Sequence, residues 1–283
     1  MSVNRKIYHL DMSETNPIAP EMRAEILARL DAIEKEHDVS VLYACESGSR
    51  GWGFASPDSD YDVRFLYVHR LPWYFRLGAQ RDVIEQPISG ALDVGGWELR
   101  KALGLLRKGN ATLIEWLDSP IVYRADAQFL AALRDAARQV HQPAHTFHHY
   151  ISMAHKNYRE YLRGETVRLK KYLYVLRPTL AALWIEQGRG VAPMPFQQLV
   201  DAIITDAALR DAIAQLLAIK RCAVEAEYGA SLPIINAFLE RELTRLENTP
   251  AFAPQDVDFS ILERLLLDTV LRCNGARVSE QVQ

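Results

Sequence analysis

The sequence lacks the apolar runs that membrane proteins need. A membrane-spanning helix takes about 20 consecutive, mostly apolar residues, and no run approaches that length in the 283 residues. The first residues, MSVNRKIYHLDMSETN, also lack the apolar stretch and the small-residue cleavage site of a secretory signal. We therefore expect a protein of the cytoplasm with no membrane partner.

Cysteine and positive charge are also scarce. The three cysteines, Cys45, Cys222 and Cys273, lie far apart and form no C-x-x-C pair, which excludes a disulfide framework and a cysteine zinc site. The net charge of −3 excludes a strongly basic nucleic-acid-binding chain, but it leaves room for a local basic patch.

The pattern of apolar residues changes along the chain near residue 126. Before it, alternating and helical patterns mix, with strands expected over 39–47 and 61–68 and a hairpin from 82–86 and 91–94. Helices are expected there over 20–37, 97–108 and 112–117. Beyond it, only helices are expected, over 126–140, 145–163, 166–186, 195–204, 206–229, 232–247 and 258–272. The prediction is an α/β (α+β) domain with a small mixed sheet over 1–125, followed by an all-helical domain over 126–283.

One stretch, SGSRGWGFASPDSDYDVRFLYV (47–68), carries chemistry that a turn alone does not explain. Asp60 and Asp62 alternate with apolar residues at the start of an expected strand, so both side chains lie on one face, with Cα atoms about 7 Å apart. Two carboxylates held together repel each other unless a cation lies between them. Oxygen ligands select a hard ion, Mg²⁺ or Mn²⁺. Asp58 is expected to remain a turn residue.

Three other sites with similar residues are excluded by spacing. A calcium loop starting at Asp58 would need glycine and glutamate where Val63 and His69 stand. No Gly-Lys-Ser/Thr sequence completes a P-loop, and the glycines at 48, 51 and 53 do not fit G-x-G-x-x-G.

The remaining pattern is an apolar strand, Gly48-Ser49, ten residues, and then Asp60-x-Asp62 entering a second strand. This pattern resembles the nucleotidyltransferase superfamily of DNA polymerase β. Longer stretches, including DVGGWELRKALGLLRKGNATLIEWLDSPIVY and KKYLYVLRP, resemble a narrower group, the RNA-repair-pathway polymerase-β-like predicted nucleotidyltransferases, also described as RNA-ligase-associated.

The resemblance implies a two-metal site that moves a nucleoside monophosphate from a nucleoside triphosphate, such as ATP, to an acceptor hydroxyl. Asp60 and Asp62 would serve both metal ions. Asp93, within Leu-Asp-Val, is the best third carboxylate for metal binding and for taking the hydroxyl proton, and Glu85 is its main competitor.

The resemblance also implies contacts to the triphosphate. Gly48 and Ser49 would cradle its β- and γ-phosphates. Arg50 is expected either to add charge there or to lie on the surface. Arg64, on the face of Asp60 and Asp62, is expected to touch substrate or to form a structural ion pair.

A basic helix in the second half is the expected opposite wall of the site. The segment 156–189 holds eight Lys or Arg against three Glu. Lys170, Tyr174 and Arg177 recur on one helix face, with Lys171 beside them, and these four are expected to contact the triphosphate or the acceptor. The alternative is a solvated basic helix.

The predicted function is therefore metal-dependent nucleotidyl transfer, with an RNA end under repair as acceptor and an RNA ligase as a possible partner. Two alternatives stay open: an adenylyltransferase that modifies a protein or a small molecule, and a non-catalytic module that binds nucleotide or RNA. Retention of Gly48-Ser49, Asp60, Asp62 and Asp93 together favours an enzyme. Neither the base preference nor the oligomeric state follows from the sequence.

Overall fold

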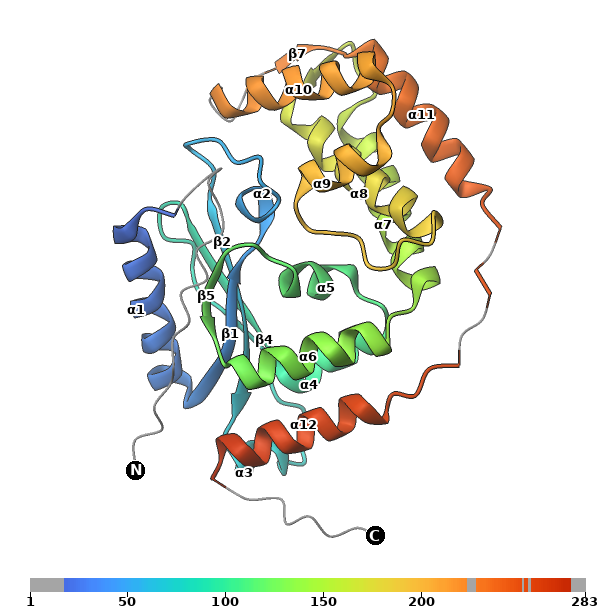
Figure 1. Ribbon diagram of the computed structural model, residues 1–283. Coiled ribbons are helices and arrows are strands. Elements are labelled where there is room, and N and C mark those ends of the chain that lie inside the picture. Colours follow the sequence, from blue (N-terminus) through green and yellow to red (C-terminus); the bar gives the residue numbers. More distant parts are fainter. Residues whose placement is uncertain (1–17, 223–227, 251, 254–255, 276–283) are drawn as a thin grey trace.

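A five-stranded mixed sheet forms the centre of the N-terminal half, and helices make up most of the rest (Figure 1). The structure is a computed structural model that describes residues 18–222, 228–250, 252–253 and 256–275. The strands lie in the order β3-β4-β2-β1-β5, and only β2 and β4 run parallel. Their bounds are β1 Val39–Glu46, β2 Tyr61–His69, β3 Val83–Glu85, β4 Leu92–Glu98 and β5 Val122–Ala125. The predicted mixed sheet followed by a helical region is confirmed.

Helices cover both faces of this sheet. Helix α1 (Pro20–His37) packs its buried Ile26, Leu30 and Ile33 on the face that carries Val63, Phe65 and Tyr67 of β2. On the opposite face, Leu66 and Val68 share a cluster with α4 (Leu99–Arg107), α5 (Ala111–Leu117) and α6 (Ala127–Gln139). Because side chains of a strand alternate between faces, Asp62 and Arg64 lie on the side of α4 and α5.

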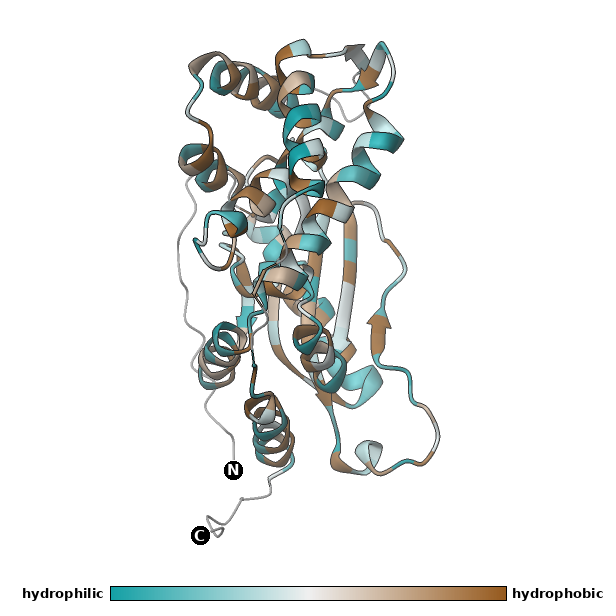
Figure 2. Ribbon diagram, turned by 90° about the vertical axis from the view of Figure 1, so that its right-hand side faces the viewer, coloured by the Kyte–Doolittle hydropathy of each residue, from teal (hydrophilic) through white to brown (hydrophobic). Residues whose placement is uncertain are grey.

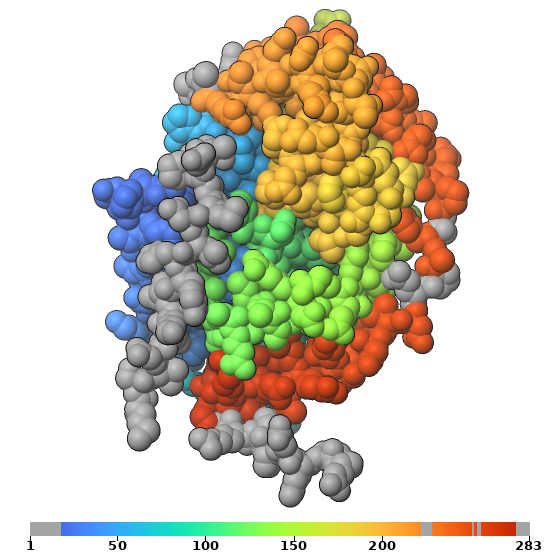
Figure 3. Space-filling model, viewed as in Figure 1, coloured from blue at the N-terminus to red at the C-terminus, as the bar shows by residue number. Residues whose placement is uncertain are grey.

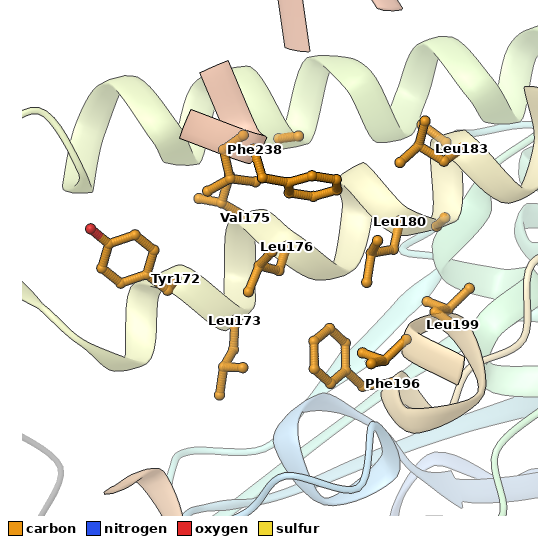
Figure 4. Close-up of a cluster of buried hydrophobic side chains, with 14 of the residues drawn as sticks. Tyr172, Leu173, Val175, Leu176, Leu180, Leu183, Phe196, Leu199 and Phe238 are labelled. Atoms are coloured by element: carbon orange, nitrogen blue, oxygen red, sulfur yellow. The ribbon is translucent and has the colours of Figure 1, made fainter. Parts of the chain in front are cut away.

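The helical half is built around α8 (Lys170–Glu186), most of whose side chains are buried. Figure 4 shows Leu176 and Leu180 of α8 on the side that faces Phe196 of α9 (Phe196–Ile203) and, on the other side of the helix, Phe238 of α11 (Pro233–Glu247) beside Val175. The remaining helices of this cluster are α7 (Pro143–Tyr161) and α10 (Ala207–Cys222). Within the described residues, none of the helices is both long and apolar enough to span a bilayer.

Several local predictions need correction. The helix expected over 166–186 begins only at Lys170, because Thr166–Arg168 forms a short strand, β6, that pairs with β7 (Tyr228–Ala230). Alternation over three residues, with Val167 buried between two exposed neighbours, is too short a signal to recognise in a sequence. Two four-residue helices, α2 (Gly48–Gly51) and α3 (Leu71–Tyr74), were also not expected.

The end of the chain returns to the sheet. Helix α12 (Ser260–Cys273) packs with α4 and α6 in the cluster on the sheet, and Arg272 donates to Asp126 at the start of α6 over 2.6 Å. Figure 3 shows α12, in red, lying along the green surface of α6. The predicted division at residue 125 therefore cuts through one shared buried cluster.

A buried ion pair joins the two halves. Arg177 of α8 donates to Glu115 of α5 over 2.6 Å, and the two side chains are only 2% and 7% exposed. Tyr150 and the Trp52 indole N–H also donate to the Glu115 carboxylate, at 2.8 and 3.2 Å. The same guanidinium donates to the Met194 carbonyl. Because hydrogen bonds occupy the carboxylate oxygens of Glu115 and the guanidinium N–H groups of Arg177, the pair fixes α8 against α5.

We expect Arg177→Met to lower the free energy of unfolding by about 3–5 kcal/mol, because Glu115 would stay buried without a countercharge. Urea unfolding followed by circular dichroism measures this loss. The double variant Glu115→Leu/Arg177→Met should lose less than Arg177→Met alone, since no unpaired charge remains. Arg138→Met is the matched control, because its partner Asp135 is exposed and such pairs contribute below about 1 kcal/mol. Equal losses in Arg177→Met and Arg138→Met would contradict the assignment.

Candidate active site

Three aspartates meet on the α4/α5 side of the sheet. Asp62 of β2 lies directly opposite Asp93 of β4 in the parallel register, and neighbouring strands are about 4.8 Å apart. Asp60 ends the preceding loop two residues before Asp62 and is exposed. The competitor Glu85 lies on the edge strand β3 opposite Gly95, and it pairs with Arg81 at 3.2 Å. The register therefore favours Asp93 over Glu85 as the third carboxylate.

Arg64 bridges two of these carboxylates. Its guanidinium lies 3.2 Å from Asp62 and 2.7 Å from Asp93, and it also donates to the Asp93 carbonyl. Burial raises the pKa of Asp62; Arg64 lowers it, and the neighbouring Asp93 and Asp60 raise it further. One cation thus bridges two of the three carboxylates, and the cluster of Arg64 with the three aspartates retains more negative than positive formal charge.

Gly48 touches the Asp62 carboxylate with its backbone. The residue adopts φ of +54°, and a Cβ atom placed there would lie 1.9 Å from Asp62 Oδ2. Only glycine fits both the left-handed backbone and this close approach. The next residue, Ser49, is buried within α2. The predicted Gly48-Ser49 turn therefore lies against the predicted aspartate pair.

Glu46 holds the backbone of Asp62 through a hydrogen bond. This fully buried residue ends β1, and its carboxylate accepts a hydrogen bond from the Asp62 backbone N–H at 2.8 Å and another from the Tyr123 hydroxyl. Burial raises the pKa of Glu46 to about 7, against the lowering effect of these two hydrogen bonds. Glu46 thereby holds the backbone of β2 at the point where Asp62 leaves it.

The loop that delivers Asp60 is held from two sides. Arg50 is buried, donates to the carbonyls of Ser59 and Asp60 at 2.6 and 3.1 Å, and stacks over the Tyr61 ring at 3.9 Å. From the helical half, Lys220 of α10 donates to the hydroxyls of Ser56 and Ser59. In this structure Arg50 positions Asp60 and is turned away from solvent.

Helix α8 reaches the loop that follows Gly48-Ser49. The Tyr174 ring packs edge-on against Trp52 and Phe54, with centroids 5.5 and 6.3 Å away. The Lys171 ammonium lies over the rings of Tyr161 and Tyr174, and Lys170 stands at the first position of the helix. The structure thus brings this end of the predicted basic helix next to the glycine turn.

Arg177 does not share that position. Its guanidinium is paired with Glu115 and is only 1% exposed, so no nucleotide reaches it in this structure. The physical reason is that i, i+4, i+7 spacing identifies one helix face but does not tell how deeply each turn is buried. We therefore leave Arg177 out of the proposed site.

The residues at the centre suit a hard divalent cation by their chemistry. Asp60, Asp62 and Asp93 offer only carboxylate oxygens, which Mg²⁺ and Mn²⁺ prefer, and their mutual repulsion favours an added positive charge. In the described part of the chain, no three His, Cys, Asp or Glu side chains are already arranged around a metal position. At the aspartates, the guanidinium of Arg64 contacts both Asp62 and Asp93.

Comparison with known families agrees with this geometry. Residues 22–268 match the model of the RNA repair pathway DNA polymerase beta family. The chain belongs to this family. It is accordingly a polymerase-β-like nucleotidyltransferase, and the resemblance predicted from Gly48-Ser49 and Asp60-x-Asp62 is confirmed.

Two individual proteins are similar to this chain. The uncharacterized protein YcgL of Bacillus subtilis (strain 168) is 43% identical over 251 residues, which cover 88% of this chain and 96% of YcgL. The crystal structure of a nucleotidyltransferase-like protein from Exiguobacterium sibiricum 255-15 matches 90% of this chain and 77% of that chain, at 13% identity and a TM-score of 0.30.

Sequence reasoning missed three supporting groups. Glu46, Lys220 and the Ser56–Ser59 pair restrain the aspartates without belonging to the motif. A signal existed for Glu46 alone, because a carboxylate at the end of the apolar strand VSVLYACE is costly unless it has hydrogen-bond partners. Nothing in the sequence links Lys220 to serines more than 160 residues away.

We expect Gly48→Ala to lose both stability and nucleotidyl transfer, because the added methyl group collides with the Asp62 carboxylate. Gly53→Ala is the matched control, since Gly53 has φ of +86° and nothing within 4 Å of an added Cβ. Backbone strain alone should cost Gly53→Ala about 1 kcal/mol, and Gly48→Ala should cost more. Chemical denaturation measures the loss of stability in each of the two variants. Equal losses would show that Gly48 does not press against Asp62.

Glu46 generates a prediction on pH dependence. Between its ordinary pKa of 4.5 and about 7, folded Glu46 keeps a proton that the unfolded chain has released. The wild-type free energy of unfolding therefore falls as pH rises through this window, by at most about 1.4 kcal/mol per pH unit from this group. Glu46→Gln cannot titrate and should gain stability relative to wild type as pH rises.

Urea unfolding of both proteins in EDTA, from pH 5 to 8, tests this expectation. Glu25→Gln, which changes an exposed glutamate of α1, is the control and should run parallel to wild type. If the free energy of unfolding of Glu46→Gln also changed with pH in parallel with that of wild type, the raised pKa of Glu46 would be contradicted.

Proposed function

We propose that this nucleotidyltransferase moves a nucleoside monophosphate from a nucleoside triphosphate to an acceptor hydroxyl at an RNA end. The observation that carries the proposal is the direct register of Asp62 with Asp93, with Asp60 two residues before Asp62 and Gly48 against its carboxylate. A metal-dependent phosphoryl-transfer site needs such a group of converging carboxylates beside a backbone turn that phosphates can approach.

Asp60, Asp62 and Asp93 would hold Mg²⁺ or Mn²⁺. When bound there, the ions supply positive charge for the attacking and leaving oxygens of the transfer. Arg64, now salt-bridged to Asp62 and Asp93, keeps these two acids together when no cation is present. Arg50 and Lys220 keep the loop that bears Asp60 in place.

The chain's own groups would then divide the remaining tasks. The Asp93 carboxylate is the group we assign to accept the proton of the attacking hydroxyl. Gly48 and Ser49 would contact the β- and γ-phosphates through the backbone and the serine hydroxyl. Lys170 and Lys171, at the end of α8 that approaches the glycine turn, would add positive charge to the triphosphate.

Two observations support RNA as the acceptor. The family to which the chain belongs is described by an RNA repair pathway. In the segment 156–189, seven basic residues remain against three acidic ones when the buried Arg177 is left out, in a chain of net charge −3. A basic surface of that kind attracts phosphate backbones.

We expect label from an α-³²P nucleoside triphosphate to enter RNA when the protein is incubated with Mg²⁺ or Mn²⁺ and total RNA. Asp60→Ala/Asp62→Ala should abolish incorporation and pyrophosphate release, and Asp93→Asn should lower turnover at least about 100-fold while the triphosphate still binds, as expected for loss of a general base. Adding EDTA should stop the wild-type reaction. Trying each of the four triphosphates separately identifies the base.

Asp82→Asn is the control, because Asp82 pairs with Lys101 outside the aspartate cluster. Label that enters protein instead of RNA would identify the acceptor as a protein side chain. Loss of turnover in Glu85→Gln, with Asp93→Asn still active, would identify Glu85 as the third carboxylate. Triphosphate binding without any transfer, across RNA and protein acceptors, would contradict the proposed reaction.

A further inference from the structure

A cavity of about 410 Å³ lies at the end of β2 that is remote from the aspartates. Its volume is within the range of sites that bind small molecules. The end of α1, the second half of β2 and the segment around α3 supply its walls, and the residues that matter here are Tyr67, His69, Arg70, Trp73, Arg76 and Arg81. Apart from Glu85, the competitor of Asp93 for the third carboxylate, none of the residues that line it is a candidate for the active site.

The cavity and the aspartates lie on opposite faces of the sheet. Tyr67 belongs to the cluster under α1, together with Val63 and Phe65, whereas Asp62 lies on the face of α4 and α5. They are also at opposite ends of β2, since α2 next to Asp62 and α3 beside the cavity lie at the two ends of the sheet (Figure 1). A molecule in this cavity therefore does not occupy the proposed triphosphate site.

Tyr67 is one of the residues that line the cavity, and its hydroxyl is buried and lacks a partner within the described part of the chain. The residue is 0% exposed, and its hydroxyl has no hydrogen-bond partner among the described residues. A buried hydroxyl without a partner costs about 1–3 kcal/mol, so such a group is uncommon unless something else satisfies it. Because the hydroxyl is covered by neighbouring atoms, an oxygen of a bound ligand would satisfy it only when those neighbours move aside.

Among the residues that line the cavity, the charges leave a positive excess. The two acidic residues among them are already held by arginines, Asp38 by Arg70 at 2.9 Å and Glu85 by Arg81 at 3.2 Å. The carboxylates of Asp82 and Glu98, whose charges act on Tyr67, are held by Lys101 and by the Tyr74 hydroxyl. Arg76 donates to the amide oxygen of Gln80 and forms no ion pair within the described part of the chain. An arginine of this kind suits an oxyanion, and a phosphate in particular.

Aromatic rings stand beside these arginines. His69 stacks on Trp73, with centroids 4.3 Å apart and planes 12° from parallel, and the Tyr67 ring meets His69 edge-on. The segment that starts at the last residue of β2, HRLPWYFRLGAQR, contains three consecutive aromatic residues and three arginines. Flat rings and arginines together are the combination with which proteins hold a base and its phosphate. The segment also exposes Phe75.

We infer that this cavity is a second nucleotide site, which binds a nucleoside phosphate outside the catalytic centre. Arg76 contacts the phosphate, the Tyr67 hydroxyl donates to a ligand oxygen, and Trp73 flanks the base. The nucleoside phosphate is either a free nucleotide or one residue of an RNA strand, which share this chemistry. The inference does not depend on the proposed reaction.

Hydrogen exchange followed by mass spectrometry locates the binding directly. The full chain in EDTA is exposed to AMP, or separately to a short oligoadenylate with a blocked 3′ end. We expect slower exchange in peptides that cover 65–85. Arg76→Gln and Tyr67→Phe should each weaken binding roughly fivefold or more, as for the loss of a hydrogen bond to a charged group. Arg138→Gln, which changes an exposed arginine elsewhere, should bind like wild type.

Protection by AMP identifies a free-nucleotide site, and protection by the oligoadenylate alone identifies an RNA contact; either supports the inference. Protection confined to peptides over 46–62, or none with either probe, overturns it. Equal protection by an octaglutamate peptide also overturns it, because the cavity would then select charge alone. Tyr67→Phe removes one oxygen atom and keeps the ring, and Arg76 is exposed, so neither variant depends on a rebuilt core.

Discussion

The structure is organised around an unfavourable interaction, the approach of like charges where β2 runs parallel to β4. The register places Asp62 directly beside Asp93, and burial and both neighbouring aspartates disfavour ionisation of Asp62. The surrounding contacts hold this arrangement together. Arg64 bridges the pair, Glu46 accepts from the Asp62 backbone N–H, and Arg50 holds the carbonyl of Asp60. The protein thus restrains charges that would otherwise separate, which is the condition that the proposed cation site requires.

The helical half contributes to this restraint through two buried polar contacts. The Arg177–Glu115 pair fixes α8 to α5, and Lys220 reaches from α10 to the serines of the loop that bears Asp60. In Figure 3 the orange surface of the α10 region meets the light-blue surface that follows α2. Both contacts are polar and buried, so their geometry tolerates little displacement. A shift of the helices would therefore also displace the loop that bears Asp60.

Much of the site followed from the sequence because its signals are local. The Gly48-Ser49 turn, the Asp60-x-Asp62 pair and the two strands that flank them lie within 30 residues, and each has its own steric or electrostatic reason. The prediction of Asp93 depended on the expected hairpin. The place of Asp93 beside Asp62 follows from the parallel pairing of two strands that are about 30 residues apart in the sequence. No local rule predicts such a register.

The predictions that failed depended on contacts between residues that are far apart in the sequence. Arg177 shares a helix face with Lys170 and Tyr174, but only the packing of α5 against α8 shows that its turn is buried. The return of α12 to the sheet depends on contacts across more than 100 residues. Short strands such as β6 exist because a partner is available, and their residues alone do not favour a strand over a helix.

Strand alternation also separates two kinds of chemistry on β2. Asp62 and Tyr67 are five residues apart, which corresponds to about 17 Å along an extended strand, and the odd spacing places them on opposite faces. A mononucleotide is too short to reach both positions. The edge of the sheet on the β4 side of β2 is formed by β3, which is only three residues long, and a longer nucleic acid that passes this edge could contact both. Next to that edge lies the α3 segment, with its arginines and aromatic rings (Figure 2 shows the helical turn of α3 projecting beyond β3). If RNA is the ligand of the second site, Arg76 places a positive charge where the RNA would leave the sheet. The second site would then hold a distant part of the acceptor RNA while its end reaches the aspartates.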